Sequence, residues 1–218
     1  MRTRASQRRK RRWRWDGLLP PLLALRARSI LAGMRCPLLA AFALALVALA
    51  APPGRAGQDD PRLDGLFNTL QNTHSETEAR ATERQIWQIW TEHKNPEIER
   101  LMQHGIAALS EDDQDEALAA FNEVVEHDKN FAEGWNKRAT VEFVMGDYSA
   151  SVEDIERTLA LEPRHFGALS GLGQIYLALD RKPLALKAFR AALAVNPHLD
   201  GVHKAIEELE KSTGGSPI

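Results

Sequence analysis

The sequence predicts an all-α protein, a solenoid in which antiparallel helix pairs stack side by side. Residue types recur with a period of 34, which becomes visible when Ile98, Ala132 and Phe166 are aligned as first residues. Within each period, small residues and large apolar residues keep to fixed positions. A fixed period of this length is typical of proteins built from repeated supersecondary units. We therefore expect three repeats, at residues 98–131, 132–165 and 166–199.

Residues 1–56 are predicted to be a basic N-terminal extension followed by a signal peptide. They hold 12 of the 28 Lys and Arg residues and a single acid, Asp16. From Cys36 to Ala50 runs an apolar stretch of 15 residues, whereas a membrane-spanning helix needs about 20. A short apolar stretch with basic residues before it and small residues after it is typical of a cleaved export signal.

The same segment suggests where translation and cleavage occur. Met34 opens a compact, ordinary signal, so we expect translation to start there and cleavage to follow Ala50 or Ala56. Cys36 is the only cysteine, and its removal would leave the exported protein without a thiol or a disulfide. The alternative is an uncleaved membrane anchor, which is the only membrane contact we expect.

The rest of the chain is acidic. Residues 57–218 carry 16 Lys and Arg residues against 29 Asp and Glu residues. This charge repels a phosphate backbone, so binding to nucleic acid is not expected.

Residues 57–97 are predicted to form a helical hairpin. Leu63, Phe67 and Leu70 recur at the spacing of one helical face. Ser75 and Glu78 have the spacing of a capping box, which marks the start of a second helix that runs to about His93.

Two indoles, Trp87 and Trp90, lie on that second helix. Counting back one period from the first repeat places them at apolar core positions, so the hairpin is interpreted as a degenerate repeat or an N-terminal cap. We expect the indoles to pack on Leu101 and Phe121. The alternative is an exposed aromatic patch for a partner.

The small residues of the three repeats predict a close crossing of the two helices in each pair, because only Gly, Ala or Ser leaves room there. The eighth position holds Gly105, Ala139 and Gly173, the twentieth holds Ala117, Ser151 and Ala185, and the twenty-fourth holds the larger Phe121, Ile155 and Phe189. Pro163 and Pro197 are expected to end the second helix of their pairs.

Turn residues mark the connection inside each pair. Gly146-Asp147-Tyr148 predicts the turn of the second repeat, and residues 180–183 predict that of the third. There Asp180 is expected to cap the next helix and Pro183 to lie in its first turn, where a missing N–H costs little.

This pattern resembles the tetratricopeptide repeat (TPR) family, in an exported bacterial form. The third repeat matches the family pattern at nearly every key position, the first departs from it at Asp112 and Lys129, and the second departs at Ser151 and Thr158. The resemblance implies a right-handed α-solenoid.

A further helix is predicted after the repeats, at residues 200–211. Val202, Ile206 and Leu209 fall on one face at helical spacing, and the other face is charged. Repeat arrays need such a polar end, so we interpret this segment as a capping helix, followed by a tail at residues 212–218.

Nothing in the sequence predicts catalysis, a cofactor or a metal site. The seven histidines form no recognisable ligand pair, and neither a metalloprotease motif nor a phosphate-binding loop is present. The acidic run at residues 111–116 lacks the glycine and the ligand alternation of a calcium loop. It is interpreted as a solvated turn followed by acids that favour a helix N-terminus.

The resemblance also implies a concave face, lined by the first helix of each pair, that binds a peptide or helix of a partner. The candidate partner-binding residues are Met102, Ile106, Asn136, Thr140, Phe143, Ser170 and Gln174. The cationic clamp with which heat-shock co-chaperones of this family hold a carboxylate is missing. Its places hold Met102, Ile106, Lys137, Gly167 and Gly171.

The predicted function is therefore a non-catalytic scaffold or adaptor for protein–protein interaction, periplasmic or secreted. Its partner is another protein that the sequence does not identify. The alternative is a structural envelope protein that assembles with itself, through an exposed end of the stack or through the indoles.

Overall fold

The computed structural model describes residues 57–212, which lie within one compact unit of the chain. Several predictions lie outside the described residues: the basic extension, the signal peptide with Cys36, the translation start at Met34, and the tail beyond Ser212. Within residues 57–212 every regular element is a helix, so the all-α prediction is confirmed. A short 3₁₀ turn, η1 (Gly57–Asp59), precedes α1 (Arg62–Asn72) and α2 (Glu76–Thr91).

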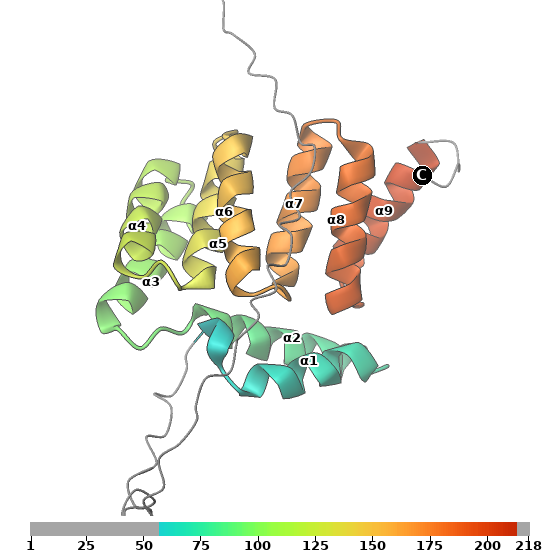
Figure 1. Ribbon diagram of the computed structural model, residues 1–218, viewed down its shortest axis with the longest axis horizontal. Coiled ribbons are helices and arrows are strands. Elements are labelled where there is room, and N and C mark those ends of the chain that lie inside the picture. The colour runs from blue at the N-terminus through green and yellow to red at the C-terminus, as the bar shows by residue number, and fades with distance from the viewer. Residues whose placement is uncertain (1–56, 213–218) are drawn as a thin grey trace, which may run out of the picture. The chain divides into compact units, whose positions relative to one another are not determined.

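Each predicted repeat range corresponds to one antiparallel helix pair, and the pairs stand side by side (Figure 1). The first pair is α3 (Pro96–Ser110) and α4 (Gln114–His127). The second is α5 (Ala132–Val144) and α6 (Tyr148–Leu161), and the third is α7 (Phe166–Ala178) and α8 (Lys182–Val195). The final helix, α9 (Asp200–Ser212), packs Val202 and Leu209 on Leu186 and Phe189 of α8.

The predicted close helix crossings are confirmed. A Cβ atom added to Gly105 would lie 2.7 Å from the ring of Phe121, and one on Gly173 would overlap the ring of Phe189. In the second pair the small residue is Ala139. There the Ser151 hydroxyl donates a hydrogen bond of 2.7 Å to the Ala139 carbonyl, which joins the two helices directly.

The three turns inside the pairs share one backbone conformation. Asp112, Gly146 and Asp180 occupy the same repeat position and have positive φ angles of 64°, 80° and 53°. Asp tolerates this left-handed region better than most non-glycine residues. The predicted helix-capping role of Asp180 is wrong, because its left-handed conformation belongs to the turn and Arg181 follows it as the N-cap. Pro183 lies in the first turn of α8 as predicted.

The N-terminal hairpin α1–α2 lies across the ends of the repeat helices (Figure 1). Its apolar cluster includes Phe67, Ile86 and Trp90, and it takes in Phe166 at the start of α7, with Val195 of α8 beside it. The predicted packing of the indoles on Leu101 and Phe121 is wrong, since those two side chains belong to a separate cluster in the first pair.

Aromatic contacts explain this position of the hairpin. The Trp90 ring stacks on the His165 ring at 4.1 Å, and the Trp87 ring meets Phe166 edge to face at 5.4 Å. Gly167 is required beneath Trp87, because a Cβ there would overlap the indole. Among residues 57–212, no helix combines the length and the hydropathy needed to span a membrane.

Candidate partner-binding surface

The hairpin closes one end of the predicted concave face. Glu133 and Gly167 both lie at the second position of their repeats, in the first turn of α5 and of α7. Glu133 is 1% exposed, and Gly167 lies under Trp87. The Lys137 ammonium lies 5.4 Å from the centre of the Trp87 ring.

A buried ionic cluster forms under the hairpin. Glu133 Oε1 lies 3.1 Å from Lys137 Nζ, and Glu133 Oε2 lies 2.8 Å from His165 Nε2. Because His165 Nδ1 accepts a hydrogen bond from the Ala168 amide, the ring's Nε2–H is the donor to Glu133. Burial acts to raise the pKa of Glu133, but Lys137 and His165 together lower it below its ordinary value. The carboxylate therefore stays charged and ties α5 to the start of α7.

Two of the predicted groove residues lie inside the protein. Met102 has no exposed surface and belongs to the core of the first pair. Asn136 is 7% exposed, and its side-chain amide donates to Glu133 Oε2 at 3.0 Å. Met102 is covered by its own helix pair, whereas Asn136 lies at the end of the face that the hairpin covers, a contact that the 34-residue pattern does not encode.

The other predicted groove residues are accessible. Thr140 and Gln174 are exposed, and Ile106, Phe143 and Ser170 are partly exposed. The Thr140 and Ser170 hydroxyls donate to carbonyls one turn earlier in their own helices. Each hydroxyl oxygen still has a lone pair with which to accept a hydrogen bond from a ligand. The open half of the face thus combines apolar side chains with neutral polar ones.

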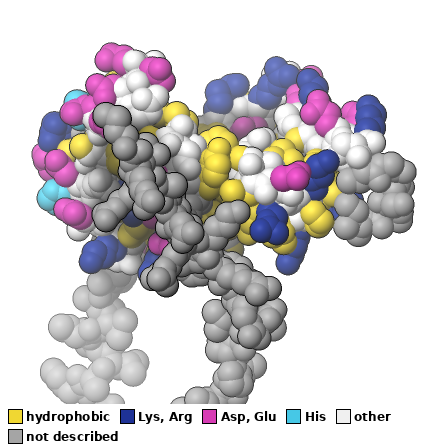
Figure 2. Space-filling model, turned by 90° about the horizontal axis from the view of Figure 1, so that it is seen from above, with side chains coloured by type: hydrophobic (Ala, Val, Ile, Leu, Met, Phe, Trp, Pro, Cys, Tyr) yellow, Lys and Arg dark blue, Asp and Glu magenta, His cyan; other side chains and the backbone are white. Residues whose placement is uncertain are grey.

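The accessible surface continues onto the edge formed by the turns within the pairs. Val144, Met145, Leu179 and Leu184 are the exposed large apolar residues among residues 57–212. Figure 2 shows hydrophobic side chains over the middle of this edge. Met145, Leu179 and Leu184 were not among the residues that the sequence predicted to bind a partner. Large apolar side chains at turn positions, where polar residues are usual, were the available signal.

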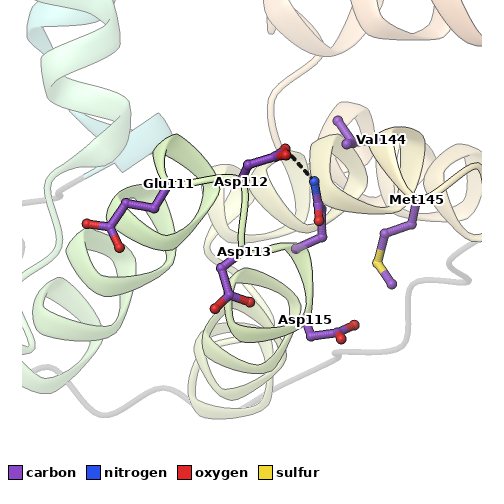
Figure 3. A pocket seen from close by; sticks show the side chains of 7 residues that line it. Glu111, Asp112, Asp113, Asp115, Val144 and Met145 are labelled. Atoms are coloured by element: carbon purple, nitrogen blue, oxygen red, sulfur yellow. Dashed lines mark hydrogen bonds between the residues drawn. The ribbon is translucent and has the colours of Figure 1, made fainter.

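An open cleft of about 590 Å³ lies between the first and second turns. Acidic residues of the α3–α4 turn form one wall, and Val144 with Met145 at the end of α5 forms the other (Figure 3). Asp113 caps α4 by accepting from the Glu116 amide, and Asp112 accepts from the Gln114 side chain at 2.6 Å. Among the described residues no group of three His, Cys, Asp or Glu side chains is arranged to hold a metal ion.

Arg138 connects the first two pairs behind this surface. It makes two hydrogen bonds to Asp154 of α6, at 2.6 and 2.8 Å, and one to Asn122 of α4 at 3.0 Å. Glu142 lies one turn further along α5. Burial, with the nearby Asp154 carboxylate, raises the pKa of Glu142 to about 7.

Stacked helix pairs with one open concave half and an apolar turn edge define a helical-repeat protein with surfaces suited to contact. The comparisons with known proteins agree with this class. The chain is 35% identical over 155 residues to a TPR repeat-containing protein of Rhizobium etli, covering 71% of this chain and 76% of the relative. The tetratricopeptide repeat family pattern matches residues 136–199. The chain belongs to the tetratricopeptide repeat family.

Solved structures share the fold at low sequence identity. The first TPR domain of Spaghetti (RPAP3), bound to the HSP90 peptide SRMEEVD, aligns with a TM-score of 0.53 and 17% identity, over 56% of this chain and 96% of that one. The TPR2B domain of yeast Sti1, in complex with pHsp70, aligns with a TM-score of 0.50 and 16% identity, over 55% of this chain and 98% of that one. At this identity the likeness concerns the fold alone.

Proposed function

We propose that the protein is a non-catalytic scaffold or adaptor of the cell envelope, which binds a peptide or helix of another protein in the open half of its concave face. The observation that carries the proposal is the pairing of partly exposed Ile106 and Phe143 with exposed Thr140 and Gln174. Apolar side chains of a ligand would pack on the first two, and its polar groups would bond to the second two. Two structural neighbours, one bound to an HSP90 peptide and the other in complex with pHsp70, support this kind of use.

The ligand proposed here differs in charge from an acidic C-terminal peptide. Gly167 and Gly171 occupy places where the co-chaperone clamp needs cations, and the first repeat contains nine acids and two bases. An acidic peptide would be repelled by that charge. We therefore propose an apolar segment that is neutral or basic.

Site-specific photo-crosslinking in intact cells tests the groove. A crosslinking residue at Thr140 or Gln174 should capture one partner, and the same residue at the exposed Ala119 of α4 should not. Phe143→Arg should abolish capture while the helical circular-dichroism spectrum is retained, because a charge would stand where an apolar contact forms. Equal capture from Ala119, or capture that survives Phe143→Arg, would contradict this assignment.

The envelope location rests on the basic and apolar pattern of residues 1–56. Cell fractionation with N-terminal sequencing of the protein tests it. We expect an exported protein that begins at Ala51 or Gly57. A protein that stays in the cytosol with its N-terminus intact would refute the location and leave the groove proposal to its own test.

A further inference from the structure

The turn edge of the stack carries an apolar centre that nothing in residues 57–212 covers. Val144 is 51% exposed, Met145 47%, Leu179 45% and Leu184 44%. All four lie in or beside the turns of the second and third pairs. Exposed apolar patches rimmed by polar residues mark interaction surfaces.

Charge is distributed unevenly along the same edge. Residues 98–131 hold nine acids and two bases, whereas residues 166–199 hold one acid and four bases. At the turns, Glu111, Asp112 and Asp115 stand at one end, and Arg181 and Lys182 stand at the other. The second pair, with seven acids and four bases over residues 132–165, lies between them.

The cleft beside the apolar centre has the shape and chemistry to hold a basic side chain. Asp112 and Asp115 line the same opening as Val144 and Met145 (Figure 3). Lys and Arg combine an apolar stem with a cationic tip and bury the stem along apolar surface. A basic residue placed here would rest its stem on Met145 and direct its charge to Asp112 or Asp115.

We propose that the turn edge binds a second copy of this chain, in an antiparallel dimer that places the acidic turn of one copy on the basic turn of the other. A two-fold axis across the stack, near the second pair, brings both acid–base contacts together at once. It also sets Val144 and Met145 of each copy against one another. The opposite orientation would oppose like charges, which is costly.

The second copy is favoured over an unrelated partner because this chain carries the complement of its own surface. Arg181 is exposed in the turn and Lys182 is half-buried next to it, so Arg181 is the side chain best placed to enter the cleft. Dimerisation through the indoles is not part of this proposal, since Trp90 is only 1% exposed.

Charge reversal tests the dimer, with the protein expressed from the full-length sequence and its mass measured by light scattering after gel filtration. We expect the wild type to dimerise, more strongly at low salt than at high salt. One variant, Glu111→Lys with Asp115→Lys, and another, Arg181→Glu with Lys182→Glu, should each weaken dimerisation by about tenfold or more. These positions leave the capping Asp113 and the left-handed Asp112 unchanged.

Mixing the two variants supplies the decisive measurement. Each variant loses attraction at both contacts, whereas the mixed pair again places opposite charges together at both, so an equimolar mixture should recover a dimer with one copy of each. Met145→Glu should abolish dimerisation in every background. Glu153→Lys with Glu156→Lys, exposed on α6, is the control and should leave the mass unchanged.

The proposal is overturned by a monomeric wild type at low salt. It is equally overturned by a dimer that survives both charge reversals, or by a mixture of the two variants that remains monomeric while circular dichroism reports folded protein.

Discussion

At the scale of single residues, the side chain at the eighth position of each repeat is small where the side chain at the twenty-fourth position is large. Where the eighth position is Gly, as at Gly105 and Gly173, the twenty-fourth is Phe; where it is Ala139, the twenty-fourth is the smaller Ile155. The ring of Phe121 or Phe189 occupies the space that a Cβ would need. The sizes of the side chains at the two positions therefore depend on each other.

Replacing Gly173 with Ala should destabilise the protein by about 1–3 kcal/mol, because overpacking forces the fully buried Phe189 ring to move. Thermal unfolding followed by circular dichroism measures the change. Adding Phe189→Ile should recover part of the loss, since the third pair then has the side chains of the second.

Gly65 in α1 is a matched control for this substitution, because nothing lies within 4 Å of a Cβ built there. Gly65→Ala should stabilise the protein by about 0.5–1 kcal/mol through helix propensity alone. If both substitutions shifted the unfolding temperature in the same direction, the packing explanation for Gly173 would fail.

At the scale of helices, a carboxyl group in α5 makes the contact between α5 and α6 sensitive to pH. Burial, with Asp154 adding to it and Arg138 opposing it, raises the pKa of Glu142 from 4.5 to about 7. One oxygen of this carboxyl group, Oε2, is buried without a hydrogen-bond partner. The folded protein thus binds a proton at Glu142 more tightly than the unfolded chain does.

The contribution of Glu142 to stability is complete below pH 4.5 and is lost as the pH rises through about 7. Glu142→Gln, which remains neutral, should remove this loss. The variant should gain stability relative to the wild type between these two pH values. Urea unfolding of both proteins at several pH values measures the difference, and a constant difference across this range would show that Glu142 titrates normally.

The helices of the repeats could be predicted from the sequence, whereas the position of the hairpin could not. Gly105 and Phe121 lie within one 34-residue unit, so a short spacing that recurs in every repeat predicts their contact. Trp90 instead meets His165, 75 positions further along the chain, and no periodic pattern encodes such a contact. Whether the predicted groove residues bind a partner stays a prediction, but five of the seven are accessible and two are not. Thr140 and Gln174 are open, and Met102 and Asn136 are buried.

At the scale of the whole described unit, the hairpin connects repeats that do not adjoin. At one end, Gln58 beside it bonds to the Asn130 carbonyl at 2.5 Å, before the second pair. At the other end, His198 bonds to the Leu70 carbonyl at 3.0 Å, after the third pair. In ordinary repeat arrays each unit contacts only its neighbours, so unfolding can spread from an end. Because the α1–α2 hairpin contacts repeats that do not adjoin, it should make unfolding more cooperative.

Trp90→Ala tests this role of the hairpin, because it removes the side chain at the centre of the hairpin's contact with the repeats. The substitution should lower the free energy of unfolding by about 3–5 kcal/mol. Hydrogen exchange should then show α1, α2 and the start of α7 losing protection together, while α3 and α4 retain theirs. Trp135→Ala is the matched control, since that indole bonds to the Lys129 carbonyl and stacks on Arg138, away from the hairpin. Loss of the Trp135 indole should instead reduce hydrogen-exchange protection in the first two pairs. An equal loss of protection in every helix of the Trp90 variant, or the same pattern in both variants, would mean that the hairpin does not add to the coupling between the third pair and the rest.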